Sequence, residues 1–270
     1  MKRVLTAIPL IALLVAILEF FPPLVFTFLV MGVSWLALDE FFQIARKSGL
    51  EIYRWPGHVL ALLLVLAMHF FPNNFQALFV VLGSSVFILL LLGLTRRNSL
   101  SGVMGGCSAT TLGLFYIPFS LGLMILIRAA EYPQGPGKRW VFFGLLTTWF
   151  GDTAALCAGK LWGRHKLAPC ISPKKTWEGT LGGLLGNVLA ALLAREMLLP
   201  LVPLGSLLAI SLVLGVFGQM GDLAESTLKR GANMKDSSNL LPGHGGMLDR
   251  VDAVLFVAPI LFVYSIWFLK

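Results

Sequence analysis

The sequence predicts an all-α, polytopic integral membrane protein with about nine transmembrane helices. Three observations indicate this fold class: 57% of the 270 residues are apolar, only 13% are charged, and the mean hydropathy is +0.84. A soluble domain of this length needs a far more polar surface to cover its core. Lipid must therefore surround much of the apolar surface of this protein.

Apolar runs of about 20 residues, the length that a helix needs to cross a bilayer, are separated by Pro, Gly or charged clusters. We place nine spans: 4–21, 23–44, 57–72, 75–95, 103–128, 139–160, 179–199, 204–228 and 251–269. No long linker or low-complexity stretch divides the chain, so we expect a single membrane domain, 1–270. Within it, 1–128 holds the amino-terminal helices, and 139–270 holds the helices and cytoplasmic loops that carry the chemistry.

The orientation follows from the positions of Lys and Arg. With the amino terminus inside, 16 of the 21 basic residues lie on the inner side and five on the outer side. This predicts a multi-pass protein of the cell (inner) membrane whose charged loops face the cytoplasm. The net charge of +8 then suits anionic lipid. Nucleic acid is not expected as a partner, because no exposed domain combines basic and aromatic residues.

Charged residues gather in two segments near the carboxy-terminal end: 152–178 has seven and 222–252 has nine of the 34 in the chain. In a helix, spacings of three and four place one set on a single face: Asp222, Glu225, Ser226 and Lys229. Asp249 and Asp252 are likewise three apart at the start of the last span. Mg²⁺ takes carboxylate oxygens together with waters and substrate phosphates, so this segment predicts a cation site.

Cationic side chains of the same segment would neutralise phosphates in a transfer reaction: Lys229, Arg230, Lys235 and Arg250. Between them, the run 243–246 (Gly-His-Gly-Gly) permits tight turns whose N–H groups can cradle an anion. A structural interpretation also exists, since aspartates suit a helix start and Lys229-Arg230 could end a span. The four carboxylates and four cations named above, set around one glycine turn, favour the functional interpretation.

The segment 152–178 begins with Asp152, a carboxylate inside an apolar run, and such residues are usually functional or hydrogen-bonded to a neighbouring helix. Ser172-Pro173 predicts an N-cap followed by Pro at the first helical position. Lys174 and Lys175 could then hold a polyphosphate at that helix start. The two lysines also fit a simple topology signal for the inner side of the membrane.

The seventh span opens with two overlapping GxxxG pairs, Gly179 with Gly183 and Gly182 with Gly186. Small residues at this spacing let helices approach closely. The pairs predict helix packing, either within the chain or at the interface of a homodimer.

The second segment resembles a known signature. The pattern Ser226-x2-Lys229-Arg230-x4-Lys235-Asp236-x4-Leu241-Pro242-Gly243-His244-Gly245-Gly246-x2-Asp249-Arg250-x-Asp252 is similar along its whole length to that of the phosphatidate cytidylyltransferases (CDP-diacylglycerol synthases). The run 172–179 resembles a second motif of the family, and Asp152 precedes it at a similar distance. The resemblance covers about the last 120 residues.

The resemblance implies a nucleotidyltransferase of phospholipid biosynthesis that converts CTP and phosphatidate into CDP-diacylglycerol and pyrophosphate with Mg²⁺. We expect Asp222 and Asp249 as the principal metal ligands, with Asp252 supporting a second cation or orienting a basic side chain. Lys229 completes the catalytic set. The expected substrate contacts are Ser172, Lys174, Lys175, Thr176, Ser226, Arg230, Lys235, Asp236, His244 and Arg250.

Two other functions compete with this one. An ion-coupled transporter would also use intramembrane carboxylates, but it predicts paired charges in two related halves, and the sequence has no such repeat. A CTP-dependent lipid kinase would transfer the γ-phosphate of CTP to the lipid. Release of pyrophosphate or of CDP distinguishes the cytidylyltransferase from the kinase.

Overall fold

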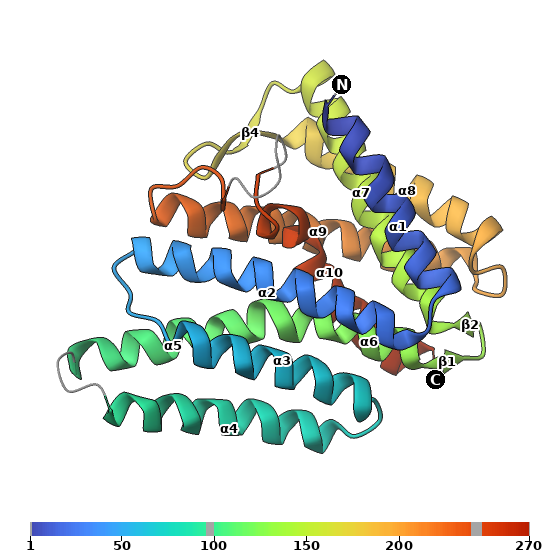
Figure 1. The fold of residues 1–270 in the computed structure, drawn as a ribbon. Coiled ribbons are helices and arrows are strands. Elements are labelled where there is room, and N and C mark those ends of the chain that lie inside the picture. Colours follow the sequence, from blue (N-terminus) through green and yellow to red (C-terminus); the bar gives the residue numbers. More distant parts are fainter. Residues whose placement is uncertain (1, 96–99, 239–244, 270) are drawn as a thin grey trace. The chain divides into compact units, whose positions relative to one another are not determined.

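The computed structural model describes residues 2–95, 100–238 and 245–269, without the side chains of residues 2–8 and 10, and is almost entirely helical (Figure 1). This confirms the predicted fold class. The α-helices are α1 (Lys2–Phe20), α2 (Pro23–Lys47), α3 (Arg54–Phe70), α4 (Phe75–Leu94), α5 (Val103–Leu114), α6 (Ser120–Ala129), α7 (Gly137–Trp162), α8 (Trp177–Met197), α9 (Leu204–Gly231) and α10 (Leu248–Phe268). A 3₁₀ turn, η1 (Leu100–Gly102), precedes α5.

Each predicted span corresponds to helical structure whose ends lie within three residues of the expected ones. Seven segments of the described residues are long and apolar enough to cross a membrane. The helix α3 has 17 residues, fewer than the roughly 20 that a span usually needs. The count of nine spans therefore stays a prediction. Exposed apolar side chains on α4, such as Phe79, Phe87 and Leu91, suit a helix that faces lipid.

The chain forms two compact units, which we describe separately. Unit 1 comprises Met1–Leu126 and Leu228–Val251, and unit 2 comprises Ile127–Thr227 and Asp252–Lys270. By these bounds α6, α9 and α10 each begin in one unit and end in the other.

In unit 1, α3 lies between α2 and α4, and α5 packs against all three (Figure 1). Glycines allow two of these approaches. A Cβ on Gly57 would lie 2.6 Å from the ring of Phe42, and one on Gly113 would lie 2.9 Å from Leu38. Phe42 and Leu38 of α2 are fully buried, so aromatic and aliphatic side chains fill the space that the glycines leave.

The predicted span 103–128 is interrupted by a π-helical turn, η2 (Phe115–Phe119), which joins α5 to α6. Pro118 lies in this turn and has no N–H to continue the helical hydrogen bonds. The hydroxyl of Ser120 donates to the carbonyl of Phe115 at 3.3 Å and so satisfies a backbone group at the interruption. Continuous apolar composition predicted the span, and the proline decided its local geometry.

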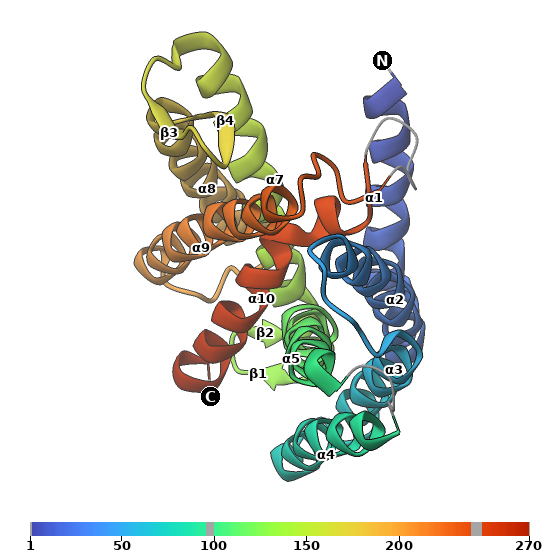
Figure 2. The same cartoon turned by 90° about the vertical axis from the view of Figure 1, so that its left-hand side faces the viewer.

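In unit 2, α7 and α8 lie side by side (Figures 1 and 2), and the GxxxG pairs form their contact. A Cβ on Gly186 would lie 2.5 Å from the carbonyl oxygen of Phe150, and one on Gly179 would lie 3.0 Å from that of Ala155. These glycines therefore pack helices within one chain. A homodimer stays a prediction, without support from this motif.

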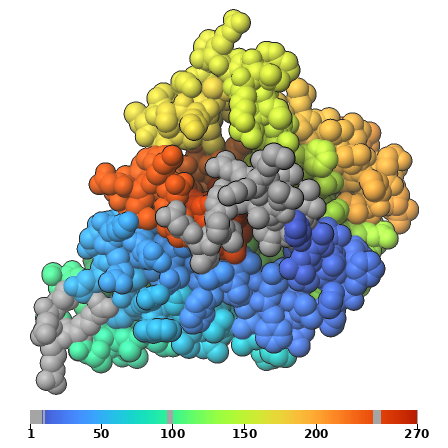
Figure 3. Space-filling view, turned by 45° about the horizontal axis from the view of Figure 1, so that its top comes forward, coloured from blue at the N-terminus to red at the C-terminus, as the bar shows by residue number. Residues whose placement is uncertain are grey.

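The sequence interpretation of Ser172-Pro173 as a helix start is wrong. Residues Ser172–Thr176 form strand β4, which pairs with β3 (Lys166–Ala168) in an antiparallel hairpin (Figure 2). In the space-filling view the yellow residues of this part of the chain lie beside the yellow-green end of α7 (Figure 3). Thr176 caps α8 instead, because its hydroxyl accepts a hydrogen bond from the N–H of Gly179 at 3.1 Å. Pro173 fits an extended edge strand as well as a first helical turn.

The other short strands, β1 (Glu131–Tyr132) and β2 (Gly135–Pro136), form a tight hairpin before α7. Gly135 has φ +134°, a conformation that favours glycine, so the sequence closes this turn without backbone strain.

Nine spans with an inside amino terminus place both the turn at Asn73 and the end of the chain outside. A reporter that is active only in the cytoplasm, fused after Lys270, is expected to give no signal. A single cysteine at Asn73, in a chain lacking Cys107, Cys157 and Cys170, is expected to react with an impermeant maleimide added to intact cells. Protection of that cysteine would show that α3 does not cross the membrane.

Candidate active site

A buried ion pair in unit 1 joins the end of α9 to the start of α10. The ammonium of Lys229 lies 2.5 Å from Oδ1 of Asp249, and the two side chains are only 10% and 9% exposed. Removing both charges from water costs several kcal/mol per ion, and further hydrogen bonds are needed to offset that cost. The remaining partners of Asp249 supply them.

Both oxygens of Asp249 accept hydrogen bonds. Oδ2 accepts from the N–H of Gly246 at 2.8 Å and from the N–H of Ser237 at 3.1 Å, and the hydroxyl oxygen of Ser237 lies 3.0 Å from it. The bond from the N–H of Gly246, two residues before the first residue of α10, satisfies a backbone donor at the start of that helix. These contacts hold the carboxylate in one orientation.

A second carboxylate, Glu40 of α2, also contacts Ser237 and the start of α10. It is 3% exposed, and both of its oxygens accept hydrogen bonds. Oε1 accepts from the hydroxyl of Ser238 at 2.6 Å and the N–H of Met247 at 2.9 Å. Oε2 accepts from the hydroxyl of Ser237 and the N–H of Leu248, both at 2.8 Å. Glu40 therefore ties residues 237–238 to the beginning of α10.

A second lysine–aspartate pair forms in unit 2. Lys175 of β4 places its ammonium 2.8 Å from Oδ2 of Asp222 in α9, and its side chain is 22% exposed. The same ammonium donates to the carbonyl of Gln219 at 3.4 Å. The hydroxyl of Ser226, one turn further along α9, lies 3.4 Å from Oδ1 of Asp222. This pair is more accessible than the pair in unit 1, because the side chain of Asp222 is 38% exposed.

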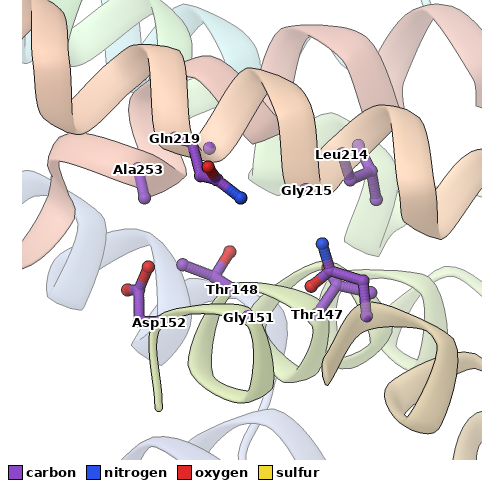
Figure 4. A pocket seen from close by; sticks show the side chains of 10 residues that line it. Thr147, Thr148, Gly151, Asp152, Leu214, Gly215, Gln219 and Ala253 are labelled. Carbon is purple, nitrogen blue, oxygen red and sulfur yellow. The ribbon is translucent and has the colours of Figure 1, made fainter. Parts of the chain in front are cut away.

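A small cavity in unit 2, large enough for about one water molecule, is lined by polar side chains. Asp152 and Thr148 of α7 face Gln219 of α9 across it (Figure 4). Asn187 of α8 also lines the cavity and is fully buried, and within the described residues neither polar atom of its amide has a hydrogen-bond partner. A polar cavity of this kind suits an ordered water.

Comparison with known proteins decides the family. The model described as "Cytidylyltransferase family" matches residues 1–268. The chain belongs to this family. It is 37% identical to the phosphatidate cytidylyltransferase of Bacillus subtilis over 268 residues, which cover 97% of this chain and 96% of the relative. It is 34% identical to the enzyme of that name from Staphylococcus saprophyticus, over 96% of both chains.

The resemblance expected from the sequence is thus confirmed, and it extends over the whole chain rather than the last 120 residues alone. Membership of the cytidylyltransferase family makes the chain a nucleotidyltransferase, and the apolar helices make it a multi-pass membrane protein.

The structure places the remaining predicted residues as follows. Ser172 is half-buried in β4 and Thr176 is buried at the start of α8, while Lys174 is exposed. Exposed charged side chains, open to a substrate, are found at Arg230, Lys235, Asp236 and Arg250. Arg230 donates to the carbonyl of Met234 at 3.0 Å. His244, together with the turn residues 239–243, lies outside the described residues.

The last predicted metal ligand, Asp252, is half-buried in α10, where its Oδ1 accepts from the N–H of Ala253 at 2.8 Å. The helix α9 approaches α10 closely at this level, since a Cβ on Gly221 would lie 2.5 Å from the carbonyl oxygen of Asp252. Glycine at 221 therefore places the turn of α9 that carries Asp222 directly against α10 within unit 2.

The carboxylates fit the chemistry of Mg²⁺. Nowhere in the described parts of the chain do three His, Cys, Asp or Glu side chains form a group that could hold a metal. Mg²⁺ rarely needs such a cage, because one or two carboxylates, waters and substrate phosphates complete its octahedron. Asp222 and Asp249 each offer hard oxygens, and each already holds a positive charge on a lysine.

The residues predicted from the sequence did not include Glu40, so its contacts with Ser237 and the start of α10 were missed. The available signal was a carboxylate in an apolar span, which is costly without a specific partner. Its partners lie about 200 residues away in the sequence, so no local pattern could identify them.

Proposed function

We propose that this chain is a phosphatidate cytidylyltransferase, which joins CTP to phosphatidate, forms CDP-diacylglycerol and releases pyrophosphate in phospholipid biosynthesis. The observation that carries the proposal is the match of nearly the whole chain, at 37% identity, to a relative of that name. Two lysine–aspartate pairs, in segments that the family resemblance had singled out, supply the charges that such a transfer requires.

The reaction needs little activation of its nucleophile. The phosphate of phosphatidate is already an anion, and one of its oxygens attacks the α-phosphorus of CTP. The new P–O bond forms as the bond between the α-phosphorus and its bridging oxygen breaks, and pyrophosphate leaves. Catalysis then depends on positioning the two substrates and neutralising their phosphates.

The lysines of the two pairs suit that task. Lys175 and Lys229 each neutralise an aspartate in the structure. With CTP bound, we expect their ammonium groups to contact phosphate oxygens as well. Arg230, Lys235 and Arg250 are exposed and can meet further phosphate charge. In this proposal Ser172, Thr176 and Ser226 complete the contacts of the substrate, and the exposed Lys174 would make a weaker one.

Mg²⁺ would be held by Asp222 and Asp249, and when bound it would supply positive charge to the phosphates of CTP. Asp252 would support a second cation or orient a basic side chain. That one cation takes both principal carboxylates is a prediction from the sequence. The positive-inside count supports loops that face the cytoplasm, where soluble CTP is found.

One assay tests the function against its competitors. Purified protein in vesicles receives phosphatidate, Mg²⁺ and CTP labelled at either the α- or the γ-phosphate. The proposal expects label in the lipid from α-labelled CTP only, and none after Mg²⁺ is chelated. Label from γ-labelled CTP would indicate a lipid kinase. Unlabelled lipid in both arms would contradict the proposal and leave transport to be tested.

A further inference from the structure

The environment of Glu40 is unusual for a carboxylate in a membrane helix. A buried carboxylate costs several kcal/mol unless hydrogen bonds compensate it. Four donors surround Glu40, two to each oxygen, at 2.6 to 2.9 Å. Both oxygens are thus engaged by donors of this part of the chain.

The four donors belong to two stretches of chain. Ser237 and Ser238 follow the end of α9, and the N–H groups of Met247 and Leu248 lie at the start of α10. Unpaired N–H groups at a helix start carry partial positive charge, so a carboxylate there is stabilised by the helix dipole. Glu40 therefore joins residues 237–238 to the start of α10.

Ser237 connects Glu40 to the candidate active site. Its hydroxyl oxygen lies 2.8 Å from Oε2 of Glu40 and 3.0 Å from Oδ2 of Asp249. The single hydroxyl proton can serve one carboxylate at a time, while the N–H of Ser237 donates to Asp249 alone. A Cβ on Gly246 would collide with both Glu40 and Ser237, so this packing also requires glycine at 246.

We propose that Glu40 is a positioning residue for Asp249, acting through Ser237 and the first turn of α10. It fixes the orientation in which Asp249 meets Lys229, and thus the geometry in which Asp249 would accept a cation. The inference rests on the proposed function for its effect on turnover. The hydrogen bonds that join Glu40 to residues 237–238 and to the start of α10 do not depend on that function.

The test compares Glu40→Gln with Asp39→Asn in the full-length protein. The matched control removes the neighbouring carboxylate of α2, whose partners include Arg54 at 2.7 Å and Gln43 at 3.1 Å. Gln has the shape of Glu but presents an NH₂ group to donors on one side. Loss of an outer-shell partner typically costs about 10–100-fold in activity or metal affinity. We expect that fall in kcat, a higher Mg²⁺ requirement, and a KM for phosphatidate near that of the wild type.

A second readout does not depend on turnover. Hydrogen exchange at the amides of residues 245–250 is expected to be about tenfold faster in Glu40→Gln, because the donors at the start of α10 lose their acceptor. Peptides from α7 and α8 should be unchanged. Ser237→Ala should lower kcat without speeding exchange at Met247 and Leu248. The double variant Glu40→Gln/Ser237→Ala should lose less kcat than the two single losses combined, because both substitutions interrupt the same connection between Glu40 and Asp249.

Each outcome decides the inference. Faster exchange with kcat within about twofold of the wild type would show that the contacts of Glu40 are only structural, and would overturn the proposal that Glu40 positions Asp249. Equal losses in Glu40→Gln and Asp39→Asn would also overturn it. If Glu40→Gln does not fold, Ser237→Ala and Glu40→Asp carry the test, and normal turnover in both contradicts it. If the wild type forms no labelled lipid, the proposed function is refuted instead. Hydrogen exchange at residues 245–250 then remains as the test of the contacts of Glu40.

Discussion

Replacing Asp249 by Asn is expected to lower lipid product formation by about a hundredfold or more, the size seen when a key electrostatic group of an active site is lost. The variant keeps the shape of the side chain but removes the charge that faces Lys229 and, in our proposal, Mg²⁺. Asp222→Asn should lose turnover to a similar degree. Asp252→Asn should be milder, at about 10–100-fold, if it acts from an outer shell. Product formation against Mg²⁺ concentration measures all three.

Stability should separate the first two variants. Lys229 and Asp249 are about nine-tenths buried, so Asp249→Asn breaks a buried ion pair, a change that typically costs about 3–5 kcal/mol. The pair of Lys175 and Asp222 is more exposed, and Asp222→Asn should leave the unfolding temperature nearly unchanged. Adding Lys229→Met to Asp249→Asn should restore stability without restoring turnover.

Normal turnover and Mg²⁺ dependence in Asp222→Asn and Asp249→Asn would place the metal elsewhere, with Asp152 and Glu225 the next carboxylates to test.

The second large effect is expected at Lys175, with its neighbour as the matched control. Successive residues of a strand point to opposite sides, and here Lys175 contacts Asp222 while Lys174 is exposed. Lys175→Ala should lower kcat/KM for CTP by between about tenfold and a hundredfold, because a partly buried charge near the phosphates is lost. Lys174→Ala should change it by about threefold or less, as for an exposed surface charge.

Steady-state kinetics over CTP concentration measure this difference, and Lys175→Arg tests whether charge alone suffices. An arginine cannot always replace a lysine point charge, but it should recover part of the loss if phosphate contact is the role. Equal, small effects at both positions would mean that Lys174 and Lys175 serve only as a topology signal for the inner side of the membrane. Equal, large effects would contradict the distinction that the hairpin makes between them.

The positions of the helices could be predicted from the sequence, because a lipid-facing helix needs a long apolar run and its ends need polar residues or turns. The turn at Pro72-Asn73-Asn74 is an example: Asn74 caps α4 by accepting from the N–H of Ala77 at 3.2 Å. The charged positions of the candidate site were equally visible, since charge in an apolar chain is costly and rarely incidental.

Local signals failed where two local structures were equally compatible with the residues. Ser172-Pro173 suits a helix start and an extended strand alike, and pairing with Lys166–Ala168 selected the strand. The GxxxG pairs predicted close packing without naming the partner, and the backbone of α7 proved to be that partner. In both cases the deciding contact came from another element of unit 2.

The order of residues by itself determined which segments are helical and which carry the reactive charges. Tertiary structure alone decided the contacts of this site: Lys229 pairs with Asp249, Lys175 pairs with Asp222, and Glu40 binds residues 237–238 and the start of α10. The reason is physical. Apolar runs and helix caps act over a few neighbouring residues, whereas a buried carboxylate is stabilised by whichever donors folding brings to it, and those of Glu40 lie about 200 positions away.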